Sequence, residues 1–280
     1  MIHILLPVHN RAKVTVVFLA ALARQTGADY RLVVVDDGCR DDTLARVRQA
    51  VPADRLKVLS GDGNLWWAGA LQLGYVALCA EAIPDGDAVL IINDDVSFAP
   101  DFLQQGLVVL AEQPGSAIQA VGHDRLTGSV DAGAVFNPLT LRFRAARPGE
   151  TPNCLSTRGL IMRAAVFKRS GGLRPRRLPH YMSDYEFTLR LRGQGVPLVC
   201  DARYRMEVRL ELTGGEQYRR NGLAAFWAEA FSNRAKYNPR HISAFALMTC
   251  PPWVAPLHLL RIWLRFGLAA LRAGLSGLRA

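Results

Sequence analysis

The chain has 280 residues, enough for one large α/β domain or two small ones, and its 50% hydrophobic and 21% charged content excludes an intrinsically disordered protein. The net charge of +10 is concentrated in residues 203–280, which hold twelve Arg and Lys against four Glu. This imbalance indicates an anionic partner: lipid headgroups, phosphates or nucleic acid. The five cysteines are widely spaced and form no CxxC pair, which is typical of small core side chains in a reducing compartment.

Strand and helix patterns alternate through the first 113 residues. Short apolar runs predict buried strands at 2–8, 30–38, 56–61 and 88–95, and helical patterns occupy 12–25, 41–50, 67–82 and 100–113. The alternation predicts an α/β fold with a mixed, mostly parallel sheet and helices on both faces. The N-terminal "MIHILLPVHN" has no basic region before its short apolar run, so we interpret it as the first strand and not a signal peptide, and expect a cytoplasmic protein.

The second half of the pattern is less regular. We predict a strand at 117–124, loops or hairpins over 125–152, a strand end followed by a helix at 159–171, a helix at 183–195 and a strand at 196–208. In the helix at 183–195, Glu186 and Arg190 are spaced for an ordinary i,i+4 ion pair.

Two predicted strands end in acidic groups, "VVVDDG" with Asp36 and Asp37, and "LIINDD" with Asn93, Asp94 and Asp95. Ligands of open α/β sheets bind outside the carboxyl ends of the strands, so the two groups can face one pocket. Carboxylates there suit a Mg²⁺ or Mn²⁺ ion that arrives with a diphosphate, or the hydroxyl and N–H groups of a nucleoside. The alternative for each group is a solvated turn in which Asp caps the next helix.

The stretch "GDGNLWWAGALQLGY" places two Trp between a turn and a helix. Trp66 or Trp67 could form an apolar wall for a base or sugar, with Asn64 and the small residues Ala68 and Gly69 letting a diphosphate approach the helix N-terminus. The alternative is a core anchor, which we favour for one of the two Trp.

The stretch "LPHYMSDYEFTLRLRG" places Asp184 at the start of a helix. A carboxylate near a sugar can act as a general base. His180 and Tyr181, just before it, are candidates for an acceptor pocket, with ordinary surface positions as the alternative.

Five motifs in this order, "PVHNR", "VVVDDG", "NLWWAGA", "INDDV" and "HYMSDYEF…R", resemble those of the family 2 glycosyltransferases of the GT-A fold, over roughly residues 2–205. The nearest branch is similar to bacterial enzymes that build cell-surface polysaccharides, such as rhamnosyltransferases. The resemblance implies a GT-A, Rossmann-like fold and assigns roles: Asp184 as catalytic base, Asp95 as metal ligand, Arg158 and Gly159 beside the donor sugar and acceptor, and Pro7, Asn10, Asp36, Asp37, Asn64, Trp67, Gly69, Asn93 and Asp94 at the donor.

Two features depart from the family pattern. Asn93 stands where the family has the first Asp of Asp-x-Asp, which removes one negative charge from the metal site. Many relatives supply a His ligand after the base, but residues 185–240 contain none, and His241 lies far along the chain beside Pro239. A non-catalytic nucleotide-sugar-binding or scaffold protein with a degenerate metal site therefore stays open as the alternative function.

The resemblance implies an inverting transfer from a nucleoside-diphosphate sugar, with UDP or dTDP as the favoured nucleotide and Mg²⁺ or Mn²⁺ as cofactor. The acceptor would be a hydroxyl of a glycan, carried on a lipid. We expect a catalytic domain at 1–210, with a nucleotide-sugar half at 1–100 and an acceptor half at 101–210, followed by a basic helical region at 211–280. The sequence specifies neither the sugar, the linkage nor the oligomeric state.

The C-terminal segment 251–280 is apolar but too often interrupted by Arg for a membrane span. On a helix, His258, Arg261, Arg265, Arg272 and Arg279 fall in one 60° sector, and Trp and Leu side chains (Trp263, Leu264, Phe266, Leu268, Leu271, Leu275) cover the rest. This pattern predicts a helix lying on an anionic membrane surface, which would hold the protein at the inner face of the cell membrane. The alternative is a helix that packs on the catalytic domain or a second subunit.

Other classes fit less well. A nicotinamide oxidoreductase would show GxGxxG after the first strand, where "LLPVHNR" stands, and a sugar nucleotidyltransferase would show a Gly-rich basic loop there. The C-terminal arginines alternate with Leu instead of stacking aromatics, so we do not expect nucleic acid as a partner.

Overall fold

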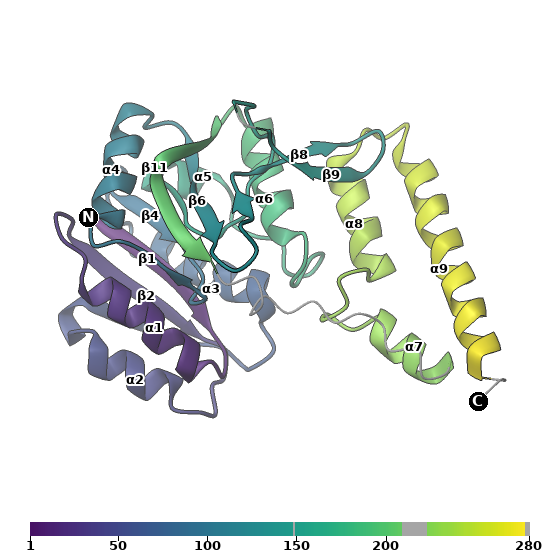
Figure 1. The fold of residues 1–280 in the computed structure, drawn as a ribbon, viewed down its shortest axis with the longest axis horizontal. Coiled ribbons are helices and arrows are strands. Elements are labelled where there is room, and N and C mark those ends of the chain that lie inside the picture. Colours follow the sequence, from purple (N-terminus) through teal and green to yellow (C-terminus); the bar gives the residue numbers. More distant parts are fainter. Residues whose placement is uncertain (148, 209–222, 278–280) are drawn as a thin grey trace.

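The computed structural model describes residues 1–147, 149–208 and 223–277. The first half alternates strands and helices as the sequence predicts (Figure 1). Its elements are β1 (Ile2–Val8), α1 (Ala12–Ala23), β2 (Tyr30–Asp36), α2 (Thr43–Ala50), β3 (Leu56–Ser60), α3 (Trp66–Ala80), β4 (Ala88–Ile91), β5 (Val96–Ser97) and α4 (Phe102–Glu112). The later ones are β6 (Ala117–Asp124), β7 (Val130–Asp131), β8 (Ala134–Asn137), β9 (Arg142–Ala145), β10 (Leu160–Arg163), α5 (Ala164–Arg169), α6 (Ser183–Gly193), β11 (Leu198–Val208), α7 (Leu223–Ala230), α8 (Pro239–Thr249) and α9 (Ala255–Gly277).

The main sheet has the strand order β3-β2-β1-β4-β10-β6-β11-β5, with β7 beside β6. Strands β1 to β4 run parallel, β10 runs antiparallel between β4 and β6, and β11 is parallel to β6. The mixed α/β architecture expected from the sequence is confirmed. The sheet positions the ends of β1, β2 and β4 at one edge, because parallel strands that follow helical crossovers all point the same way.

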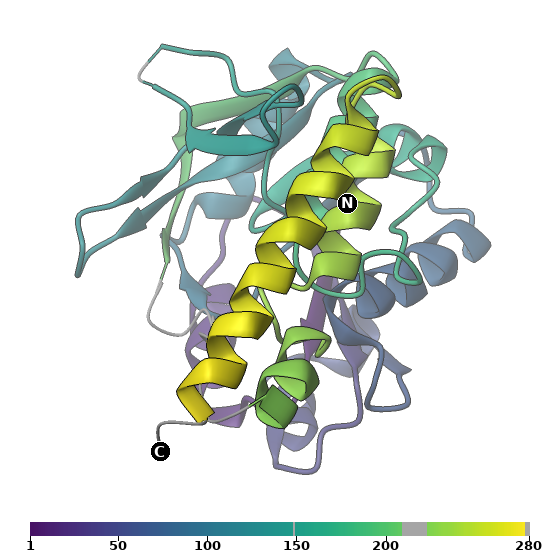
Figure 2. The same cartoon turned by 90° about the vertical axis from the view of Figure 1, so that its right-hand side faces the viewer.

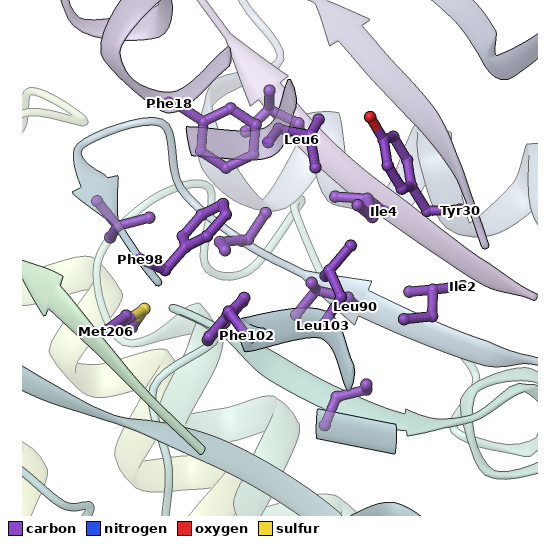
Figure 3. Close-up of a cluster of buried hydrophobic side chains, with 14 of the residues drawn as sticks. Ile2, Ile4, Leu6, Phe18, Tyr30, Leu90, Phe98, Phe102, Leu103 and Met206 are labelled. Atoms are coloured by element: carbon purple, nitrogen blue, oxygen red, sulfur yellow. The ribbon is translucent and has the colours of Figure 1, made fainter. Parts of the chain in front are cut away.

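Both faces of the sheet are buried, which explains why its central strands are continuously apolar. One core joins Ile4 and Leu6 of β1 to Phe18 of α1 and Phe102 of α4 (Figure 3). The other core receives the intervening Leu5, together with side chains of α3, α5 and α6. The alternation of neighbouring residues between two cores follows from the two-residue period of a strand.

The C-terminal helices α8 and α9 lie side by side against the β8–β9 hairpin, and α9 crosses in front of α8 in Figure 2. Phe245 of α8 is fully buried between Phe136 and Phe143 of the hairpin, with ring centroids 5.3 and 5.6 Å away. Within the described residues, none of the helices combines the length and hydrophobicity that a bilayer crossing requires. The expected boundary near residue 210 falls in 209–222, outside the described residues, and stays a prediction.

Two predicted strands are shorter than expected. β4 ends at Ile91 and β2 at Asp36, whereas the apolar runs predicted 88–95 and 30–38. The polar residues that follow each strand leave the sheet, because their side chains hydrogen-bond loop amides or ion-pair across the edge. The predicted Glu186–Arg190 ion pair is confirmed, with Nε 2.9 Å from Oε1.

Candidate functional site

Strand register brings the predicted polar groups together at one edge of the sheet. Val8 pairs with Asp36 across β1 and β2, and Leu5 pairs with Ile91 across β1 and β4. His9 and Asp37 therefore lie side by side, and Ile92 lies beside Leu6, so the loops after β1, β2 and β4 all leave the sheet at the same edge. This is the edge at which open α/β sheets bind ligands.

Asp94 and Asp95 are both buried, at 3% and 4% exposure. Asp94 Oδ2 accepts a hydrogen bond from the Thr15 hydroxyl at 2.8 Å, and Arg11 Nη1 lies 3.3 Å from Asp94 Oδ1. Arg11 Nη2 is 3.5 Å from Asp95 Oδ2, so one guanidinium faces both carboxylates. Burial raises the pKa of Asp94, against the opposing effects of Arg11 and Thr15.

Arg158 approaches Asp95 from the flank of β4 opposite to β1. The antiparallel pairing of Leu160 with Ile91 brings the residues before β10 next to those after β4. Arg158 Nε lies 3.9 Å from Asp95 Oδ1. Gly159, which follows, has φ +70°, and a Cβ there would lie 3.0 Å from the Ala120 side chain. The backbone can thus make this close turn only with glycine or under strain.

Asp184 is in the first turn of α6 and is half-buried. Burial raises its pKa to about 6, and the charge of Asp131 acts in the same direction, while the Tyr185 backbone N–H and the charge of Arg158 lower it. The charge of Arg158 therefore acts on Asp184, while its Nε lies beside Asp95. Met182, just before the helix, has φ +66°, a conformation that costs energy for a non-glycine residue.

Asp36 and Asp37 point in different directions despite being adjacent. The Asp37 carboxylate is buried and accepts hydrogen bonds from the backbone N–H groups of Gly63, Leu65 and Trp66 at 2.9 to 3.2 Å. Asp36 is half-buried and, among the described residues, accepts one backbone hydrogen bond, from the Cys39 N–H at 2.8 Å, with the Cys39 thiol beside it, which leaves more of its carboxylate available to a ligand. These contacts favour Asp36 as a donor contact, whereas Asp37 holds the loop before α3.

Asn10 supports the neighbouring loop. It has φ +50°, and its Oδ1 accepts a hydrogen bond from the Arg40 N–H at 2.7 Å. Its Nδ2 lies 3.1 Å from His9 Nε2, and His9 Nδ1 lies 2.5 Å from the Asp37 carbonyl oxygen. Pro7, three residues before Asn10, is half-buried in β1. Asn10 therefore joins the loops after β1 and β2, and the donor roles of Pro7 and Asn10 stay predictions.

The helix α3 begins with amides that already have partners. Besides the Asp37 contacts, the Ala68 N–H donates to the Pro179 carbonyl at 2.9 Å. Gly69 is buried, and a Cβ there would lie 3.2 Å from Leu65 Cβ and 3.8 Å from Pro175. The role of Gly69 as a diphosphate contact stays a prediction, which this packing does not favour.

The two Trp side chains lie in different environments, and one of them packs against the core as the sequence predicts. Trp67 packs against the second core, and its Nε1 donates to the Thr157 hydroxyl at 3.1 Å. Trp66 is half-buried, and its Nε1 donates to Asn64 Oδ1 at 2.8 Å. Its ring centroid lies 5.8 Å from that of His180. Trp66 is thus better placed than Trp67 to form an exposed apolar wall.

His180 and Tyr181 lie between α3 and α6, with ring centroids 4.6 Å apart. Burial lowers the pKa of His180 to about 4, helped by the charge of His241, so the imidazole is neutral at pH 7. The charge of His241 acts on His180, so α8 contributes a side chain near this site. From the sequence, His241 is a poor substitute for a metal ligand because it lies far along the chain, and only the packing of α8 brings it near His180.

The residues present can accept a divalent cation if the donor completes its coordination. Asp95 Oδ1 is buried and has no hydrogen-bond partner within the described residues. Hard cations prefer oxygen ligands and often use one or two carboxylates plus phosphate oxygens. Within residues 1–147, 149–208 and 223–277, no three His, Cys, Asp or Glu side chains form a metal-binding cluster. Asp95, with half-buried Asn93 beside it, would therefore hold such an ion weakly by itself and more tightly together with a ligand.

The sequence model of Glycosyl transferase family 2 matches residues 3–168, which include the acidic strand ends and Arg158. The chain belongs to this family. Solved glycosyltransferase structures share its fold. The mannosyltransferase PcManGT from Pyrobaculum calidifontis, in complex with GDP-Man and Mn²⁺, has a TM-score of 0.57 and 17% identity over 99% of this chain and 73% of that one. S. aureus TarS in complex with UDP-GlcNAc has a TM-score of 0.58 and 17% identity over 95% and 71%. These likenesses confirm the GT-A fold.

Two curated relatives of this family 2 chain are longer than the region that they share with it. An uncharacterised glycosyltransferase of Haemophilus influenzae is 22% identical over 194 residues, covering 68% of this chain and 62% of the relative. An uncharacterised protein of Sinorhizobium fredii is 27% identical over 198 residues, covering 62% and 20%. The chain thus spans between a fifth and about three fifths of the lengths of these relatives.

Proposed function

We propose that the protein transfers a sugar from a nucleoside diphosphate to a hydroxyl group of a glycan, with inversion at the anomeric carbon. The observation that carries this proposal is the position of Arg158, whose Nε lies 3.9 Å from the buried Asp95 and whose charge opposes the rise in the pKa of the half-buried Asp184. A donor diphosphate near Asp95 and an acceptor hydroxyl near Asp184 would then both lie near the guanidinium of Arg158. Holding two substrates in line supplies a large part of the rate of such a transfer.

Asp184 acts as the general base in this scheme. With a pKa raised to about 6, it is mostly deprotonated at pH 7 and still more basic than an ordinary Asp. The carboxylate takes the proton of the acceptor hydroxyl as the oxygen forms a bond to the anomeric carbon. The bond from that carbon to the diphosphate oxygen breaks with its electron pair, and the nucleoside diphosphate leaves.

The charge of the leaving diphosphate needs stabilisation. Asp95, with Asn93 beside it, would hold the cofactor, a Mg²⁺ or Mn²⁺ ion, which when bound neutralises developing negative charge on the phosphate oxygens. The PcManGT structure contains GDP-Man and Mn²⁺, which supports a divalent cation and a nucleotide sugar here. Asp36 would bind the base or ribose, and UDP or dTDP remains the favoured nucleotide, with a hexosyl or rhamnosyl group as the sugar.

The acceptor pocket would lie between Trp66, His180 and Tyr181. Their rings contact one another in a row, with centroid distances of 5.8 and 4.6 Å and interplanar angles of 58° and 65°. Aromatic faces suit the apolar face of a pyranose ring, and the neutral His180 can hydrogen-bond a hydroxyl group. This wall supports a sugar as the acceptor.

The exposed face of α9 supports a membrane-bound acceptor. Leu257, Leu260, Leu264, Leu268 and Leu271 are 44 to 67% exposed and fall on one side of the helix. Arginines border this stripe and are also exposed (Arg261, Arg265 and Arg272). Leu side chains in the acyl boundary with Arg at anionic headgroups would place the protein on the inner face of the membrane, where a lipid-linked glycan for surface polysaccharide is made.

His258 does not belong to this basic face, contrary to the helical-wheel expectation. It is buried, and its Nε2 lies 2.9 Å from the Pro138 carbonyl oxygen of the β8–β9 turn. The expected positions of Leu275 and Arg279 fall on side chains outside the described part of the chain. The basic border of the stripe therefore rests on the other three arginines.

The function is tested by donor binding and transfer together. Thermal stability of the purified protein is followed with UDP-, dTDP- and GDP-sugars, each with Mg²⁺, with Mn²⁺ and with chelator, because ligands that bind the native state raise its melting temperature. We expect one nucleotide class to stabilise the protein in a metal-dependent way, and donor hydrolysis or transfer to follow. Binding without any turnover would instead support the non-catalytic alternative.

The membrane role is tested with a matched pair of variants. Leu260 on α9 and Leu247 on α8 are both 57% exposed. We expect Leu260→Glu to release the protein from vesicles that contain anionic lipid, and Leu247→Glu to leave binding unchanged. Equal binding by both variants and the unchanged protein would refute the assignment of the α9 face.

A further inference from the structure

Arg11 is the charged group at the site to which no role has been assigned. It is the last residue before α1, and its backbone is fixed there. Its N–H donates to the Thr43 hydroxyl at 3.1 Å, and its carbonyl accepts from the Thr15 N–H at 2.9 Å. Only the side chain is therefore able to move, and it is 32% exposed.

The side chain occupies the place of a cation. Its two terminal nitrogens lie 3.3 Å from Asp94 Oδ1 and 3.5 Å from Asp95 Oδ2. Buried carboxylates that face each other are strongly unfavourable without a counter-charge. With Arg158 close to Asp95, two guanidiniums balance two carboxylates, and the acidic pair is neutral before any metal arrives.

The contact of Arg11 is loose compared with a fixed ion pair of the same protein. Arg190 Nε lies 2.9 Å from Glu186 Oε1, and its side chain is 16% exposed. Tight charge-assisted hydrogen bonds are about 2.7–2.9 Å long, which the Arg11 contacts exceed. Arg11 is therefore held by charge more than by directed hydrogen bonds, and it faces solvent through which it can leave.

We propose that Arg11 exchanges with the divalent cation: it neutralises Asp94 and Asp95 in the free protein, leaves them when the cation enters with the donor, and then binds the donor diphosphate. The inference rests on the proposed donor and cation site at Asp95. Thr15 keeps Asp94 in place during the exchange, because its 2.8 Å hydrogen bond does not involve Arg11's side chain. A guanidinium released beside a phosphate can bind it with two parallel hydrogen bonds.

The exchange predicts effects of opposite sign on two ligands. Without Arg11, a cation meets uncompensated carboxylates, so Arg11→Gln should bind Mn²⁺ alone about tenfold more tightly. The diphosphate loses a contact, so the same variant should bind UDP or GDP in saturating Mn²⁺ about tenfold more weakly. A residue with a purely structural role would not move the two affinities in opposite directions.

The experiment measures Mn²⁺ affinity by electron paramagnetic resonance of free Mn²⁺, and UDP and GDP affinity by calorimetry. Arg24→Gln is the control, since it removes the same charge from the exposed far end of α1. Arg24→Gln should change neither affinity. Unchanged or weakened Mn²⁺ binding by Arg11→Gln would overturn the exchange.

Circular dichroism would reveal whether Arg11→Gln folds, and a second variant tests the proposal if it does not. Arg11→Lys keeps the charge but loses the bidentate geometry, so it should bind Mn²⁺ like the unchanged protein and UDP or GDP more weakly. Unchanged nucleotide affinity would overturn the proposal. If the unchanged protein binds nucleotide with Mn²⁺ while these variants show no contrast, only the exchange fails. If neither the unchanged protein nor Arg11→Gln binds Mn²⁺ or nucleotide, the proposed donor site and the exchange both fail.

Discussion

Substituting the adjacent residues Asp36 and Asp37 separately should separate ligand binding from stability. Asp37→Ala removes the acceptor of three backbone N–H groups, from Gly63, Leu65 and Trp66. Each amide that loses its partner costs about 1–3 kcal/mol, and the low end applies because Gly63 is exposed and water can replace the carboxylate there. We therefore expect Asp37→Ala to lower the free energy of unfolding by about 3 kcal/mol.

Asp36→Ala removes the acceptor of one backbone N–H, that of Cys39, and should cost about 1 kcal/mol. It should also weaken nucleotide binding, since its carboxylate is the one left available for a donor. Asp37→Ala, once folded, should weaken nucleotide binding less.

The assay is urea unfolding of both variants, with a shared m-value, followed by nucleotide titration below the unfolding transition. The expected difference of about 2 kcal/mol corresponds to roughly 4–8 °C in melting temperature for a protein of this size. Equal destabilisation by the two variants, or stronger loss of nucleotide affinity in Asp37→Ala, would refute the division of roles.

Three further predictions concern Asp184, Glu186 and His258. Asp184→Asn should abolish transfer and leave donor binding near normal. In the unchanged protein the transfer rate should fall as the pH drops through about 6, since only the deprotonated carboxylate accepts a proton. A transfer rate that does not fall as the pH is lowered to 4 would contradict the assignment. Glu186→Gln should lower the free energy of unfolding by about 3 kcal/mol in urea, because it leaves the guanidinium of Arg190 half-buried without its carboxylate. His258→Ala should lose the contact to the Pro138 carbonyl and speed limited proteolysis around α9, without changing nucleotide affinity. An unchanged digestion pattern would show that this contact does not anchor the helix.

The site contains more charge compensation than acidic motifs alone suggest. Arg11 and Arg158 surround Asp94 and Asp95, and together they keep a buried acidic pair tolerable in the absence of a cation. The replacement of a third acid by Asn93 reduces the charge that must be balanced. A weaker metal site that forms mainly with the donor is the physical consequence we expect.

The sequence alone determined the alternating strands and helices, and with them the edge of the sheet where ligands bind. The apolar runs of β1, β2 and β4 and the polar residues after them are local patterns, which depend on the two-residue period of strands and the 3.6-residue period of helices. These periods operate within a few residues. They predicted Asp184 at the start of α6, although they placed the ends of β2 and β4 too late.

Only the tertiary structure decided which of two neighbouring side chains stabilises the fold and which is left available to a ligand. Asp36 and Asp37 are equivalent in the sequence, but the loop before α3 closes over Asp37 and takes up its carboxylate. His258 shares a helical sector with arginines, yet the β8–β9 turn covers it. Arg11 and Asp95 are far apart along the chain and meet only because β1 pairs with β4. Such contacts depend on strand register and loop closure between distant segments, and no local period of the sequence encodes them.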